Sequence, residues 1–200
     1  MEIFYNSMKI PLIGIFVYII LKRSVMEKGY IHIYCGEGKG KTSILNGMVL
    51  RALGAGKKVE YVRFLKNRPT SENAILEKLG VHIKSFYHFS TKFVWEMDPK
   101  EVETFKKETL EGYEYFKQQL KNEKLDILLA DEILGAVQNG FIDQKDLVEA
   151  LKNKSQHLEV ALSGRYSFAE LNQVANLISE IKPIKHYLDE GVIAREGIEF

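Results

Sequence analysis

The chain has 200 residues, of which 46% are hydrophobic and 28% are charged, and this is enough for one globular domain with a substantial core. Its formal net charge is +1, so the overall balance does not favour nucleic acid or a membrane surface as the main partner. The single cysteine excludes an intramolecular disulfide framework, which fits a reducing, cytoplasmic location.

The amino terminus carries an uninterrupted apolar run over residues 10–21, between Lys9 and Lys22. This run is shorter than the roughly 20 residues that a membrane-spanning helix needs, and no small-residue cleavage site of a signal peptide follows it. We therefore expect no firm membrane association. The sequence favours an extension over residues 1–25 and a domain over residues 26–200 that starts naturally at Met26. An amphiphilic anchor and an extra packed helix are the alternatives.

A glycine-rich stretch over residues 30–43 is the strongest local signal, and it predicts a strand, a tight turn and a helix. Three glycines at alternate positions allow the backbone to turn its N–H groups inward, and the helix adds its positive dipole end. In this pattern Lys41 reaches phosphate oxygens and the Thr42 hydroxyl holds Mg²⁺. The alternative is a lysine-rich surface turn. The expected nucleotide-binding residues are Gly36, Glu37, Gly38, Lys39, Gly40, Lys41, Thr42 and Ser43.

The rest of the chain alternates strands and helices, which is typical of an α/β fold with a parallel sheet. The helix after the loop ends at residues 54–56, where two glycines stand, and a long helix is capped by Asp98 and Glu101. Residues 87–97 are rich in aromatics without a clear period. We expect strands at residues 58–65, 81–86, 125–132, 158–165 and 175–186, and helices at residues 72–79, 98–120, 143–152 and 168–174.

Two carboxylates, Asp131 and Glu132, end the apolar run over residues 125–132. A central parallel strand delivers such residues to the carboxyl edge of the sheet, where ligands bind. We therefore expect both to face the glycine-rich loop and to hold Mg²⁺ directly or through water. An exposed acidic pair at a strand end is the alternative.

These landmarks together resemble one family, the ATP:corrinoid adenosyltransferases of the CobA/BtuR type. The resemblance runs from about residue 28 to the end of the chain. It rests on residues 35–42, 51–54, 63–66, 93–96 (Phe-Val-Trp-Glu), 130–132, 163–165, 182–186 and 197–200. Where the general loop pattern has its first glycine, this chain has Cys35, and the family also lacks that glycine.

The resemblance implies a P-loop (RecA-like) fold, with a mostly parallel six-stranded sheet flanked by helices, in a cytoplasmic homodimer. The implied reaction moves the 5′-deoxyadenosyl group of MgATP, or of ATP with Mn²⁺, to the cobalt of a reduced corrinoid and releases triphosphate, in adenosylcobalamin biosynthesis or salvage. Cobalt(I) is itself the nucleophile, so the protein supplies position and charge. A flavodoxin or ferredoxin is the implied electron donor.

The resemblance also implies roles for residues outside the loop. Phe93 and Trp95 match an aromatic pair that packs against the corrin and displaces its lower axial ligand; ordinary core aromatics are the alternative. Arg51 and Arg165 match arginines near the nucleotide, although Arg51 could be a surface residue of its helix. Glu37 could touch the ribose or face solvent.

Two other functions stay open at the level of sequence. The same loop serves kinases and ATPases, which transfer or hydrolyse the terminal phosphate. A non-catalytic ATP-binding partner protein would bind the nucleotide and release no product.

The expected domain boundary gives a first prediction. A chain expressed from Met26 should fold and bind ATP as tightly as the 200-residue chain, because residues 1–25 contribute nothing to the loop. Comparative calorimetric titration with MgATP measures this, and an insoluble or nucleotide-blind product would refute the boundary.

Overall fold

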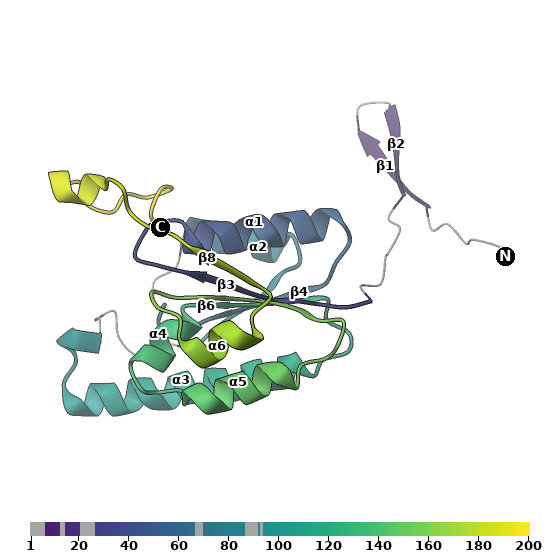
Figure 1. Ribbon diagram of the computed structural model, residues 1–200. Coiled ribbons are helices and arrows are strands. Elements are labelled where there is room, and N and C mark those ends of the chain that lie inside the picture. Colours follow the sequence, from purple (N-terminus) through teal and green to yellow (C-terminus); the bar gives the residue numbers. More distant parts are fainter. Residues whose placement is uncertain (1–6, 13–14, 21–26, 67–69, 87–91, 93) are drawn as a thin grey trace.

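The computed structural model describes residues 7–12, 15–20, 27–66, 70–86, 92 and 94–200. Its centre is a six-stranded sheet in the order β5-β4-β6-β7-β3-β8, and all strand pairs in it are parallel (Figure 1). The strands are β3 (Ile31–Cys35), β4 (Val59–Arg63), β5 (His82–Ser85), β6 (Ile127–Asp131), β7 (Glu159–Ser163) and β8 (Leu177–Glu180).

Helices cover both faces of this sheet, as Figure 1 shows. One face carries α1 (Lys41–Gly54) and α2 (Ser71–Lys78); the other carries α3 (Pro99–Leu120), α4 (Ile133–Gln138), α5 (Gln144–Lys152) and α6 (Ala169–Val174). Two short 3₁₀ helices, η1 (Val94–Glu96) and η2 (Tyr187–Glu190), complete this part of the fold. The predicted α/β class is confirmed, with an all-parallel sheet where a mostly parallel one was expected.

The central strands are apolar because both of their faces are covered. Every residue of β4 and β6 is buried, and Leu128 and Leu129 are fully buried on opposite faces of β6. Fully burying one such side chain contributes about 1.5–3 kcal/mol. The sheet is therefore a rigid platform that holds the carboxyl ends of its strands in fixed positions.

The predicted cap of the long helix is confirmed. The Asp98 carboxylate accepts the backbone N–H groups of Lys100 and Glu101, and the Glu101 carboxylate accepts the N–H of Asp98. Pro99 occupies the first helical position, where its missing N–H costs nothing.

Two elements differ from the expectation. Helix α4 was not predicted, because five of its six residues are buried and such a short apolar segment has no helical period to read. The apolar amino-terminal run forms an antiparallel hairpin of β1 (Ser7–Leu12) and β2 (Ile15–Ile20), so the alternative of an extra packed helix is wrong. Its isoleucine, valine and aromatic content favours strands, and the hairpin forms a two-stranded sheet of its own, drawn apart from the main sheet in Figure 1.

In the described part of the chain, no helix is both long and apolar enough to cross a membrane.

Candidate active site

The glycine-rich loop, residues 36–40, joins β3 to α1 and lies against the ends of two other strands. Gly36 has a φ of 113°, and a Cβ there would lie 2.3 Å from the Ile181 carbonyl oxygen, so that only glycine fits. The Gly36 N–H donates to the Arg165 carbonyl (2.7 Å) and the Gly38 N–H to the Ile181 carbonyl (2.9 Å). The segments that follow β7 and β8 therefore fix the shape of the loop.

Lys41 spans the inside of this loop. Its ammonium group donates to the carbonyl oxygens of Gly36 (2.6 Å) and Gly38 (3.0 Å). Helix α1 begins at Lys41, so its free N–H groups and positive dipole end lie beside that ammonium group. The arrangement is a concentrated positive site of the kind that binds phosphate.

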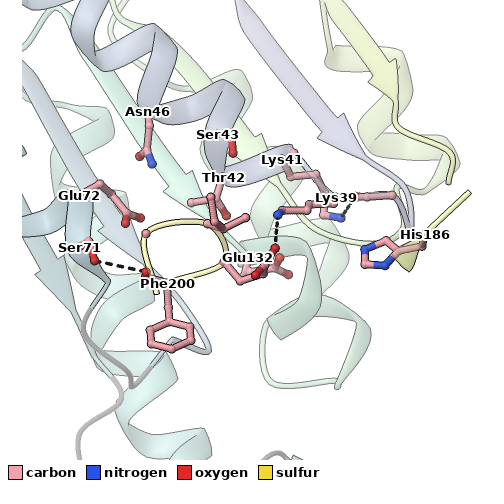
Figure 2. A pocket seen from close by; sticks show the side chains of 15 residues that line it. Lys39, Lys41, Thr42, Ser43, Asn46, Ser71, Glu72, Glu132, His186 and Phe200 are labelled. Carbon is pink, nitrogen blue, oxygen red and sulfur yellow. Dashed lines mark hydrogen bonds and ion pairs between the residues drawn. The ribbon is translucent and has the colours of Figure 1, made fainter. Parts of the chain in front are cut away.

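A cavity of about 420 Å³ opens over the loop (Figure 2). Residues 38–43 and Asn46 form one wall, α2 contributes Ser71 and Glu72, and Glu132 lies at the edge of the sheet. The carboxyl-terminal residues 197–200 and His186 form the remaining wall. The loop, the sheet edge and the end of the chain therefore enclose one space.

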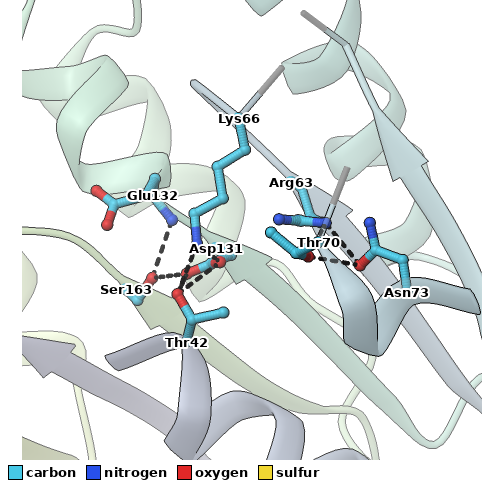
Figure 3. A network of polar contacts seen from close by, with 8 residues as sticks. All are labelled: Thr42, Arg63, Lys66, Thr70, Asn73, Asp131, Glu132 and Ser163. Carbon is cyan, nitrogen blue, oxygen red and sulfur yellow. Dashed lines mark hydrogen bonds and ion pairs between the residues drawn. The ribbon is translucent and has the colours of Figure 1, made fainter. Parts of the chain in front are cut away.

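Asp131 ends β6 beneath this cavity, and its side chain is completely buried. The Thr42 hydroxyl donates to its carboxylate at 3.1 Å, the Ser163 hydroxyl at 2.5 Å and the Lys66 ammonium at 2.5 Å (Figure 3). Burial alone would raise the pKa of the Asp131 carboxyl, but Lys66, Ser163 and the nearby Arg63 charge outweigh it and lower that pKa. Asp131 is therefore ionised at neutral pH.

Glu132 differs from its neighbour in environment and in the direction of its pKa shift. Its φ of 61° lies in the left-handed region, and its N–H donates to Ser163 Oγ at 2.9 Å. Burial and then the adjacent Asp131 charge raise the pKa of the Glu132 carboxyl above its usual value. The two carboxylates that the sequence placed at this strand end thus have opposite pKa shifts.

A second cavity, of about 510 Å³, lies on the other side of Glu132. Its wall combines apolar side chains, Leu65, Val94 and Phe105, with charged ones, Lys66, Lys92 and Arg165. Glu132 lines both cavities. The site therefore has two compartments with a carboxyl group at their junction.

The carboxyl-terminal tail is held onto the loop by polar contacts. The Lys39 ammonium donates to Glu199 Oε1 (2.5 Å) and to the Tyr187 hydroxyl (2.6 Å), and the Ser71 hydroxyl donates to the Phe200 carbonyl (3.2 Å). Lys39 also lines the first cavity. Its predicted contact with phosphate stays a prediction, since its ammonium group is bonded to the tail here.

The structure brings most of the predicted site residues together. Those that line the first cavity are Gly38, Lys39, Gly40, Lys41, Thr42, Ser43 and Glu132; Asp131 bonds to Thr42 beneath it, and Arg165 lines the second cavity. Gly36 shapes the loop, as described above.

Two other predicted residues, Arg51 and Glu37, line neither cavity. Arg51 lies ten residues beyond Lys41 on α1, about 15 Å along the helix, and is exposed. Glu37 accepts a hydrogen bond from the Tyr166 hydroxyl. Trp95 lies in η1, next to Val94 of the second cavity, and Phe93 lies outside the described residues.

Sequence reasoning missed Lys66, Ser163, His186, Glu199 and Phe200 as site residues. Lys66 and Ser163 had a usable signal, because each stands at or just after the carboxyl end of a strand that pairs with β6. The tail had no local signal for its contacts, which span about 160 residues of sequence, and the resemblance at residues 197–200 marked the segment without giving its role.

This site defines a P-loop nucleotide-binding protein of the α/β class. Its marks are a strand, a glycine-rich loop with a lysine across it, and a helix whose first-turn threonine bonds to the carboxylate at the end of β6. The family model for ATP:corrinoid adenosyltransferase BtuR/CobO/CobP matches residues 27–200. The chain belongs to this family.

The names of similar proteins support this family assignment. The chain is 34% identical over 175 residues to the corrinoid adenosyltransferase of Escherichia coli K12, which covers 87% of each chain. It is 33% identical to corrinoid adenosyltransferase CobA of Salmonella typhimurium, with the same coverage of both. It is 32% identical to the corrinoid adenosyltransferase of a Sinorhizobium species, over 90% of this chain and 85% of the relative.

The buried pair of Asp131 and Lys66 gives a stability prediction. Asp131→Asn should lower the free energy of unfolding at pH 7 by about 3 kcal/mol, because it leaves a cation without its buried partner. The carboxyl pKa is lowered on folding, so this stabilisation is present above the unfolded pKa of about 3.9 and is lost as the pH falls through the folded value. Urea denaturation at several pH values measures it.

Asp126→Asn is the matched control. Asp126 is also buried, and its carboxylate accepts the Lys58 backbone N–H, so its loss should be about 1 kcal/mol. Equal losses in the two variants would contradict a special contribution of the Asp131 pair.

Proposed function

We propose that this protein transfers the 5′-deoxyadenosyl group of ATP to the cobalt of a reduced corrinoid, in cobalamin biosynthesis or salvage. The observation that carries the proposal is the pair of cavities that meet at Glu132, a phosphate cradle on one side and a partly apolar compartment on the other. A transferase of this kind needs one compartment for the polyphosphate and another for the corrin ring of the acceptor. Membership of the family supports the same reaction.

The reaction forms a bond between cobalt(I) and C5′ of the ribose and breaks the C5′–oxygen bond, whose electron pair leaves with the triphosphate. Cobalt(I) brings its own electron pair, so no side chain has to attack or to be deprotonated. The protein's contribution is charge and alignment. Lys41 and the N–H groups at the start of α1 would neutralise the leaving triphosphate, and the loop would hold the chain of phosphates while C5′ faces the second cavity.

The residues present fit a magnesium ion. The Thr42 hydroxyl and the Asp131 carboxylate lie 3.1 Å apart, with Glu132 at the same sheet edge, and hard oxygen ligands are what Mg²⁺ or Mn²⁺ prefers. When bound, the cation would add positive charge at the phosphates. Thr42, Asp131 and Glu132 would hold it.

Phe93 and Trp95 are proposed to face the corrinoid. The support is the position of η1, whose Val94 lines the second cavity beside Leu65 and Phe105. Arg165 lines the same cavity, and we propose that it contacts the nucleotide at the junction. Arg51 and Glu37 stay proposals from the resemblance alone.

The domain is proposed to start near Met26, which the family match from residue 27 supports. We also propose a cytoplasmic homodimer that takes electrons from a flavodoxin or ferredoxin. Edge strand β8 exposes Leu177 and Ile178, which supports a contact with a second copy, and sedimentation analysis would count the chains.

An anaerobic assay tests the reaction. With MgATP and chemically reduced cobalamin, the protein should convert the cobalt(I) absorbance spectrum into that of a light-sensitive alkylcobalamin. Lys41→Met should slow this about 10²- to 10³-fold, the usual cost of one group that stabilises transition-state charge. Release of ADP and phosphate with unaltered cobalamin would instead favour a kinase or ATPase, and ATP binding without any product would favour a partner protein.

Replacing Trp95 tests the aromatic assignment. Trp95→Ala should leave ATP affinity unchanged and reduce turnover from cobalt(II), with a reduced flavodoxin or ferredoxin supplying the electron, at least about tenfold. The corrin would lose the apolar group that displaces its lower ligand, and cobalt(II) would become harder to reduce. Trp95→Phe keeps an aromatic face and should retain most of the activity. Turnover of the alanine variant equal to that of the unaltered protein would remove the assignment.

A further inference from the structure

Lys66 makes contacts that the reaction outlined above does not use. Its ammonium nitrogen lies 2.5 Å from the Thr42 hydroxyl oxygen and 2.5 Å from Asp131 Oδ2. Those are two of the three groups proposed to hold Mg²⁺. As Figure 3 shows, the lysine reaches down from the end of β4 between the loop threonine and the strand-end aspartate. The Lys66 ammonium group thus bridges two oxygens of the proposed metal site.

The backbone aims Lys66 at this point. Among the described residues, the non-glycine positions with positive φ are Leu65 (54°) and Glu132 (61°), and such conformations are strained. They follow the ends of paired strands, β4 and β6, and both line the second cavity. Backbone strain of this kind persists only where contacts with the surrounding structure hold the residue in place.

The Leu65 side chain supplies the anchoring contacts. A Cβ at Gly135 would lie 2.8 Å from Leu65 Cδ1, so the leucine packs directly on the backbone of α4. It also packs against Phe105 and Phe141. The Phe64 N–H also donates to the Asp131 carbonyl (2.8 Å). These contacts hold the segment after β4 so that the Lys66 side chain reaches the Asp131 carboxylate.

We propose that the Lys66 ammonium group and the divalent cation are alternative occupants of the space between Thr42 and Asp131. Without nucleotide, Lys66 balances the buried Asp131 charge and keeps free metal out. When the metal arrives with the triphosphate, Lys66 gives up the two oxygens. Because Lys66 also lines the second cavity, its charge then lies beside the reacting end of the nucleotide. This inference rests on the proposed metal site.

The electrostatics favour this exchange. The Asp131 side chain is fully buried while that of Lys66 is 23% exposed, so the lysine has a path out and the carboxylate has none. Free Mg²⁺ would have to break a short ion pair in a region of low dielectric, which is costly. The phosphates of a bound nucleotide offer the ammonium group a new anionic partner, and this lowers the cost.

Manganese binding to the purified full chain without nucleotide tests the proposal, with electron paramagnetic resonance counting free Mn²⁺. The unaltered protein should bind Mn²⁺ weakly, and Lys66→Met should bind it about tenfold more tightly or better, because the metal no longer displaces a cation. Adding Asp131→Asn to Lys66→Met should abolish the gain. The Lys66→Arg variant keeps the positive charge, so its affinity for Mn²⁺ should stay as weak as that of the unaltered protein.

Lys92→Met is the matched control. Lys92 lines the same cavity, and its ammonium group pairs with Glu101, so its loss removes an equal charge without freeing Asp131. An equal gain in Mn²⁺ affinity in this variant would show that the loss of any nearby positive charge is enough, and this would overturn the proposal. Unchanged affinity in Lys66→Met would overturn it as well.

Stability gives a second measurement. Lys66→Met leaves Asp131 buried without its cation, so it should melt at a lower temperature, and Mn²⁺ should restore the melting temperature because it binds only the folded state. If this variant does not fold, the same two measurements can be made on Lys66→Gln, which keeps a hydrogen-bond donor but has no charge. Failure of adenosyl transfer in the unaltered protein would refute the proposed function alone, since the metal measurements need neither ATP nor corrinoid.

Discussion

The buried carboxylate of Asp131 is the interaction on which the rest of the site depends. It accepts hydrogen bonds from Thr42 at the start of α1, from Ser163 at the end of β7 and from Lys66 beyond β4. Three separate segments are thereby fixed to the end of one central strand. A charge with no exposure to water is stable only with such partners, so the loop, the sheet edge and the lysine keep one relative geometry.

The strand order turns this fixed point into a site with two sides. Strand β7 lies between the loop strand β3 and β6, which leaves room at the carboxyl edge for the phosphate cavity over α1. On the other side, α4 and the segment after β4 enclose the second cavity. Glu132 lies where the two meet, and its raised pKa reflects burial there. Such a layout suits a group transfer between two large ligands better than hydrolysis by water.

Much of this could be predicted from the sequence, because the informative signals were local. The loop pattern and the apolar run before Asp131 each lie within about a dozen residues, and their meeting follows from the parallel sheet. Ser163 and Lys66 stand at or after strand ends and could have been suspected, but their contacts with Asp131 depend on strand order. The contact of Glu199 depends on how the tail returns to the loop and could not be read locally. Helix α4 and the hairpin escaped prediction because a short apolar segment has no distinct period.

We propose that the loop presents carbon, and not phosphorus, as the electrophile. Phosphorus-31 nuclear magnetic resonance of the completed reaction with ATP and reduced cobalamin tests this proposal, because the spectrum identifies the polyphosphate that leaves. We expect intact tripolyphosphate, in an amount equal to the alkylcobalamin formed. A spectrum of ADP and orthophosphate would contradict it.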